Sequence, residues 1–192
     1  MVDSATLDGH GTARTPDPLV VGMVVWLASE LMFFSGLFAA WFTLRANATT
    51  WPPAGVELAT ARTAVATAVL LGSSFTMHLA VAAANRDDRA RSVRWLVVTV
   101  AMGAVFLGNQ AWEYAVAPFH IGSHAYGSIF YLMTGFHGLH VLGGLVFLLT
   151  IAGVVGGRSK APAARTVEMA AAYWHFVDAV WVAMFTVVYL IS

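Results

Sequence analysis

Long apolar segments dominate this sequence. Five segments, each of about 20 or more mostly apolar residues, follow one another along the chain, and each is long enough to cross the hydrocarbon core of a bilayer as an α-helix. A transmembrane β-barrel would instead show segments of about ten residues with alternating hydrophobicity. The pattern predicts an all-α, polytopic membrane helix bundle whose five spans run approximately over Leu19–Leu44, Arg62–Ala84, Val93–Ala115, Tyr126–Val155 and Glu168–Ile191.

The composition agrees with a membrane protein and excludes several other classes. Hydrophobic residues make up 59% of the chain and charged residues only 10%, whereas soluble domains carry about 25% charged residues. The formal net charge is zero, so there is no overall basic field to attract nucleic acid. The absence of cysteine excludes disulfides, thiolate metal sites and thiol nucleophiles.

The distribution of charge predicts the organisation and orientation of the chain. Residues 1–18 are polar and form an N-terminal tail without the features of a signal peptide, followed by a transmembrane domain over 19–192. Basic residues gather on one side of the predicted membrane, which places the N-terminus in the cytoplasm and the C-terminus outside. That side carries Arg14, Arg86, Arg89, Arg91, Arg94, Arg158, Lys160 and Arg165, and the other side carries Arg45 and Arg62.

Glu30 lies near the middle of the first span, where an ionisable group is costly and usually has a purpose. A lone carboxylate in hydrocarbon takes up a proton, so Glu30 is expected to be protonated or paired. Proton handling, a fixed hydrogen bond and packing between helices remain open as its role.

The fourth and fifth spans each carry two polar groups on one helix face. His137 and His140, three residues apart, can chelate one metal ion or reach two neighbouring helices. His175 and Asp178 are also three apart, and the simplest interpretation is a buried pair that satisfies its own hydrogen bonds. Because Glu30, His140 and Asp178 all fall near the midplane, we expect a buried polar network between the first, fourth and fifth spans.

Three further polar residues are weaker candidates. Gln110 and Glu113 share a face of the third span near its outer end, where they can simply meet the membrane interface. His78 lies in the inner half of the second span. On this basis, the second and third spans are expected mainly to pack.

These residues together resemble subunit III of the haem–copper oxidases, and most closely that of cytochrome c oxidase. The matching stretches occur in the family's order across nearly all of the chain beyond the tail. They are Ser29–Phe34, Ala125–Ser128, Gly135–Val141 with Gly143 and Gly144, and Tyr173–Asp178 with Trp181.

The resemblance implies an accessory role in aerobic respiration. Such a subunit carries no haem, copper or other metal, packs on the catalytic subunit I in a complex that also contains subunit II, and binds phospholipid between its helices. It supports proton uptake and durable turnover in a proton-pumping complex of the bacterial plasma membrane, which can join a larger respiratory supercomplex. Glu30 matches the position at which this family reacts with hydrophobic carbodiimides.

The chain departs from the mitochondrial form of the family, which has seven spans, because the first two are missing. The shortened form and the alanine-rich composition are typical of an actinobacterial protein. The question of what closes the family's lipid-binding cleft in this shortened form is left open. Three alternatives also remain: a five-span subunit III of a quinol oxidase, a stand-alone membrane metalloenzyme and a proton channel centred on Glu30. The metalloenzyme would use His137, His140, His175, Asp178 and Glu113.

Overall fold

The computed structural model describes residues 17–157 and 163–191. In these residues the chain forms five helices that are long and apolar enough to cross a membrane, which confirms the predicted all-α, five-helix fold. The orientation of the termini stays a prediction. The helices are α1 (Pro18–Ala46), α2 (Thr60–Ala84), α3 (Arg89–Val116), α4 (Ala125–Gly156) and α5 (Ala163–Phe185), and α5 continues into a π-helix, η1 (Thr186–Leu190).

Capping side chains explain where α1, α3 and α4 begin. Asp17 accepts a hydrogen bond from the Leu19 amide at 3.0 Å, and Pro18 takes the first helical position, which is a combination typical of a helix start. Asp88 accepts from the Arg91 amide in the same way, so α3 begins four residues before the predicted span. His124 caps α4 through its Nδ1.

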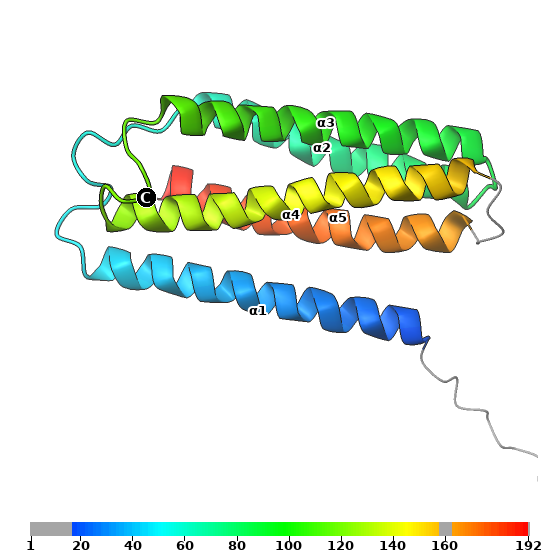
Figure 1. The fold of residues 1–192 in the computed structure, drawn as a ribbon, viewed down its shortest axis with the longest axis horizontal. Coiled ribbons are helices and arrows are strands. Elements are labelled where there is room, and N and C mark those ends of the chain that lie inside the picture. Colours follow the sequence, from blue (N-terminus) through cyan, green and yellow to red (C-terminus); the bar gives the residue numbers. More distant parts are fainter. Residues whose placement is uncertain (1–16, 158–162, 192) are drawn as a thin grey trace, which may run out of the picture.

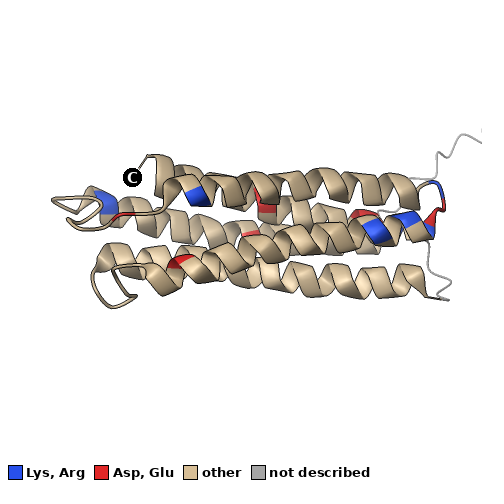
Figure 2. Cartoon of the chain, turned by 90° about the horizontal axis from the view of Figure 1, so that it is seen from above, with Lys and Arg blue, Asp and Glu red and all other residues tan. Residues whose placement is uncertain are grey.

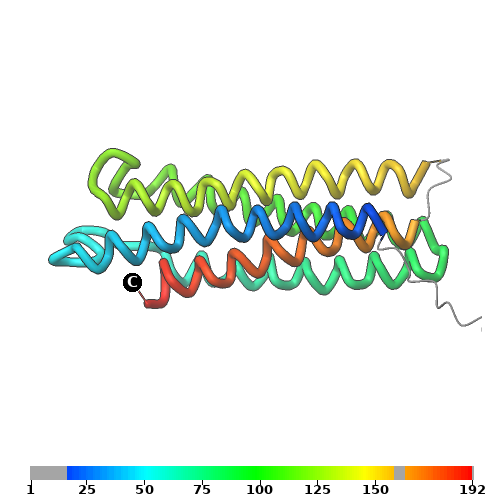
Figure 3. The backbone as a smooth tube through the Cα atoms, turned by 90° about the horizontal axis from the view of Figure 1, so that it is seen from below, coloured from blue at the N-terminus to red at the C-terminus, as the bar shows by residue number. Residues whose placement is uncertain are grey.

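Four helices form the core of the bundle, and α1 lies outside them. Helices α2, α3, α4 and α5 pack around a common core, while α1 lies along α4 and the edge of α5 (Figure 1). All five run along the long axis of the molecule (Figure 3). Only Phe34 and Trp41 of α1 are buried. Most of α1 is therefore available to lipid or to another subunit.

The buried face of α3 consists of small and polar residues as much as apolar ones. It repeats at intervals of three and four residues, which is the spacing of a packed helix seam. In a membrane, small residues let helices approach closely and polar residues bond across the interface, whereas large apolar residues face lipid. The members of this seam are Ser92, Leu96, Thr99, Gly103, Phe106, Gln110 and Glu113.

Candidate functional site

Glu30 of α1 and His140 of α4 meet at the seam between these helices. The His140 Nε2 atom lies 3.0 Å from the Glu30 Oε2 atom. Trp26, one turn earlier in α1, donates its indole N–H to Glu30 Oε1 at 3.0 Å. Both oxygens of the carboxyl group therefore have a partner, which is the paired state expected for a carboxyl in hydrocarbon.

The second nitrogen of His140 determines how protons are distributed in this pair. His140 Nδ1 lies 2.6 Å from the Phe136 carbonyl oxygen, which can only accept, so Nδ1 must carry a hydrogen. Nε2 then either accepts a hydrogen from a protonated Glu30 or donates one to the ionised carboxylate. In both arrangements one proton lies between Glu30 and His140.

Aromatic side chains surround the pair but leave it partly open. The His140 ring lies 4.9 Å from the Phe34 ring and 6.2 Å from the Phe33 ring, measured between centroids. The side chains of His140 and Glu30 remain 17% and 23% exposed. This exposure lies midway along α1 and α4.

Tyr173 of α5 joins the same site. Its hydroxyl donates to the His140 carbonyl oxygen at 3.0 Å, and its ring stacks on Trp26 with centroids 4.9 Å apart. The first, fourth and fifth spans thus do meet here, as expected from the sequence, but α5 contributes Tyr173 rather than the predicted His175 or Asp178.

His137 and His140 face different surroundings. The His137 ring is buried and stacks on Trp181 at 4.9 Å, and neither of its nitrogens has a hydrogen-bond partner in the described residues. The two imidazoles therefore reach separate neighbours, one of the two alternatives that the sequence left open. Among residues 17–157 and 163–191, no three His, Asp or Glu side chains form a group that could hold a metal ion.

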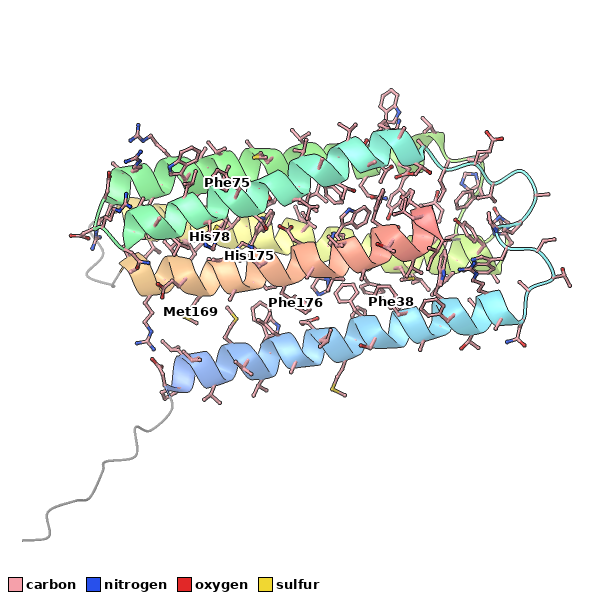
Figure 4. The ribbon with its side chains drawn as sticks, turned by 180° about the vertical axis from the view of Figure 1, so that it is seen from behind. Phe38, Phe75, His78, Met169, His175 and Phe176 are labelled. Atoms are coloured by element: carbon pink, nitrogen blue, oxygen red, sulfur yellow. The ribbon has the colours of Figure 1, made fainter. Side chains whose placement is uncertain are left out.

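His175 and Asp178 form a second polar group, between α5 and α2. Ser74 of α2 donates its hydroxyl to Asp178 Oδ2 at 2.5 Å and lies 2.9 Å from His175 Nδ1. His78, which is exposed, lies beside His175 with ring centroids 6.0 Å apart (Figure 4). The prediction that Asp178 joins Glu30 and His140 in one network was therefore wrong, because His175 and Asp178 contact Ser74 of α2 instead.

Gln110 and Glu113 lie in the interior rather than at the membrane interface. Both are only 3% exposed. Glu113 Oε2 accepts hydrogen bonds from Thr63 of α2 at 3.3 Å and from Tyr189 of η1 at 2.9 Å. This corrects both the expected interfacial position and the expectation that the second and third spans mainly pack, since each of them supplies polar groups to a buried cluster.

Comparison with known proteins identifies the family. The chain matches the cytochrome c oxidase subunit III family over residues 1–192. It belongs to that family. A probable cytochrome c oxidase subunit 3 of Mycobacterium leprae is 48% identical over 201 residues, which cover 98% of this chain and 99% of that protein. The cytochrome c oxidase subunit 3 of Thermostichus vulcanus is 39% identical over 199 residues, covering 97% and 98%.

The family assignment places the chain in an oxidase complex. As a haem–copper oxidase subunit III it is one of several subunits of a multi-pass membrane assembly. The probable subunit 3 of Mycobacterium tuberculosis strain H37Rv, 48% identical over 181 residues that cover 92% of this chain and 89% of that protein, agrees with the expected actinobacterial type. The functional roles predicted for the site residues, and the absence of a metal or haem on this chain, stay predictions.

Proposed function

We propose that this chain is the accessory, non-redox subunit III of a proton-pumping cytochrome c oxidase in the bacterial plasma membrane. In that role it packs on the catalytic subunit I beside subunit II, with its N-terminus in the cytoplasm, and it supports proton uptake and durable turnover. The observation that carries the proposal is the Glu30–His140 pair, together with membership of the family.

The pair is suited to hold a proton at the edge of the bundle. One proton lies between Glu30 and His140, because the Phe136 carbonyl keeps a hydrogen on His140 Nδ1. The pair also joins α1, the least buried helix, to α4 in the core. Loss of the pair would therefore affect both the position of a proton and the attachment of α1.

An apolar groove between α1 and α5 supports a role in binding phospholipid. It encloses about 180 Å³ and is lined largely by apolar side chains. Phe38 of α1 and Phe176 of α5 lie on its two walls, in the space between the helices (Figure 4). The apolar lining suits a lipid acyl chain, which favours a lipid as the occupant of this groove between the helices. Both walls of the groove belong to the five described helices.

Cytochrome c is the electron donor that the relatives favour, since those named here are cytochrome c oxidase subunits. The alternative is a quinol oxidase. Steady-state oxygen consumption by the purified complex distinguishes them: rapid turnover with reduced cytochrome c supports the proposal, and turnover with a quinol alone supports the alternative.

The role of Glu30 is tested in the intact oxidase with Glu30→Gln. Wild-type complex is expected to be labelled at Glu30 by a hydrophobic carbodiimide, and the variant is expected to lose that label and to inactivate sooner during turnover. Glu57→Gln, which changes an exposed carboxyl group outside the helices, is the matched control and should change neither property. Unchanged assembly, turnover lifetime and labelling in the Glu30 variant would show that the assigned role is wrong.

A double-mutant cycle tests the pair itself. Glu30→Gln and His140→Leu each remove one partner of the 3.0 Å contact, so we expect their effects on stability to be coupled by about 0.5–3 kcal/mol. Fully additive effects would contradict an interaction between these residues.

A further inference from the structure

One face of α3 remains exposed over almost the whole length of the helix. Arg91, Val98, Val105 and Trp112 follow one another at intervals of seven residues, which places them along one side of the helix. Val98, Val105 and Trp112 are 39%, 59% and 60% exposed. At 1.5 Å per residue, Arg91 and Trp112 are separated by about 32 Å, close to the thickness of the hydrocarbon core.

The basic end of this face contains a cavity. It measures about 370 Å³ and is lined by Asp88, Arg91, Arg94, Trp95 and Val98. A second hollow of about 290 Å³ shares three of these residues. The cavity lies where α2 joins α3, and Figure 2 shows basic residues at this end of the bundle. Along the helix, its wall changes from the guanidinium groups of Arg91 and Arg94 to the indole of Trp95 and then to the apolar side chain of Val98.

The positive charge in the cavity is available to a ligand. No carboxylate of the described residues lies within 4.0 Å of the guanidinium groups of Arg91 or Arg94, whereas Arg89 is paired with Asp87. Asp88 also lines the cavity, but its Oδ1 accepts the Arg91 amide at 3.0 Å as the cap of α3. Within the part of the chain that the structure describes, the cavity therefore presents two guanidinium groups without a carboxylate partner, beside one carboxylate that caps α3.

We propose that Arg91, Arg94 and Trp95 bind the phosphate of an anionic phospholipid whose acyl chains lie along Val98 and Val105. Two guanidinium groups suit a phosphate diester, and an indole ring favours the level of the lipid head groups. The apolar stripe continues from the cavity in the direction that acyl chains take. The site is separate from the groove between α1 and α5 and does not depend on the proposed role of Glu30.

A lipid explains the whole surface better than inorganic phosphate does. Inorganic phosphate would use Arg91 and Arg94 but leave Trp95 and the exposed valines without a role. Basic clusters next to a membrane span are a recognised feature of anionic lipid binding. Binding should therefore depend on the head-group charge and also on the presence of acyl chains.

The test measures lipid retained by the intact oxidase complex. Complexes carrying wild-type chain, Arg91→Gln with Arg94→Gln, or Arg89→Gln are equilibrated with detergent micelles containing equal amounts of phosphatidylglycerol and phosphatidylcholine. They are then isolated, and the bound lipids are quantified by mass spectrometry. Near a membrane surface one arginine changes lipid binding about fivefold, so we expect the double variant to lose the wild-type preference for phosphatidylglycerol at this site by about 25-fold.

Two controls separate the site from unspecific effects. Arg89→Gln removes a charge from the same turn of α3 but outside the cavity, so its preference should stay close to that of the wild type. Arg91→Lys with Arg94→Lys keeps the charge and should retain most of the preference even if the glutamine variant assembles poorly. Equal retention of phosphatidylglycerol by the wild type and the glutamine variant would overturn the proposal, and so would complete displacement of the lipid by millimolar inorganic phosphate.

Discussion

The ring of Trp174 packs closely against two glycines, Gly103 and Gly144, and this contact predicts the effect of an added methyl group. A Cβ atom added at Gly103 of α3 would lie 2.7 Å from Trp174 Cη2 and 2.7 Å from Leu145 Cδ2. A Cβ atom added at Gly144 of α4 would lie 3.0 Å from Trp174 Cζ3. Trp174 cannot shift easily, because it is fully buried and its Nε1 donates to the Ser73 hydroxyl at 2.9 Å. We therefore expect Gly103→Ala to force α3 away from α5.

The magnitude follows from comparison with a matched site. Overpacking of a tight core costs about 1–3 kcal/mol, and replacing a helical glycine by alanine contributes about 0.5–1 kcal/mol of stability. Gly108 lies on the same helix, and no atom would come within 4 Å of an added Cβ there. Gly108→Ala should therefore show only the gain, and the free energies of unfolding of the two variants should differ by about 1–3 kcal/mol.

The assay is equilibrium unfolding of the purified protein in mixed micelles with increasing denaturing detergent, followed by circular dichroism. Equal stability of Gly103→Ala and Gly108→Ala would refute the packing described for Trp174. A second measurement combines Gly103→Ala with Trp174→Phe, which removes the ring atoms that clash. The alanine should be less destabilising in that background, and purely additive effects would also contradict the reasoning.

Two further predictions concern the buried polar groups. Ser74→Ala removes the described partner of Asp178 Oδ2 and leaves both carboxylate oxygens unpaired among the described residues. It should therefore lower the free energy of unfolding by about 1–3 kcal/mol. Ser35→Ala removes only a hydrogen bond within its own helix and is the control in the same unfolding assay. His137→Phe should be neutral or stabilising because neither ring nitrogen has a partner among the described residues, whereas His140→Phe should destabilise by breaking the contact with Glu30. The opposite order would contradict the separate roles given to the two histidines.

The fold could be predicted from the sequence because hydrophobicity accumulates over each span. A segment of about 20 apolar residues has few alternatives to a membrane helix, and the Asp17-Pro18 pair at the start of α1 is typical of a helix start. The beginning of α5 at Ala163 was harder to predict from the sequence, because its first turns carry Arg165 and Glu168 and do not resemble a membrane span. Local composition therefore predicts the presence of each helix better than it predicts the residue at which the helix begins.

The polar contacts were harder to predict because they depend on helix rotation. Glu30 and His140 were expected at the same depth, and they meet, but Ser74 gave no signal because a single serine is common in membrane helices. Glu113 lies close to the end of its span, which favoured the interface. Small and polar residues recur at intervals of three and four along α3, from Ser92 to Glu113. That pattern could have predicted that Glu113 lies in the interior of the bundle.

The central claim is that this chain works as the third subunit of a cytochrome c oxidase. The most direct measurement is to isolate the chain through an affinity tag from membranes in mild detergent and to record the visible spectrum and metal content of the product. The account predicts haem a absorption from co-purified subunits, with oxygen consumption driven by reduced cytochrome c. Isolation of the chain alone with stoichiometric iron, copper or zinc bound to it would contradict the account.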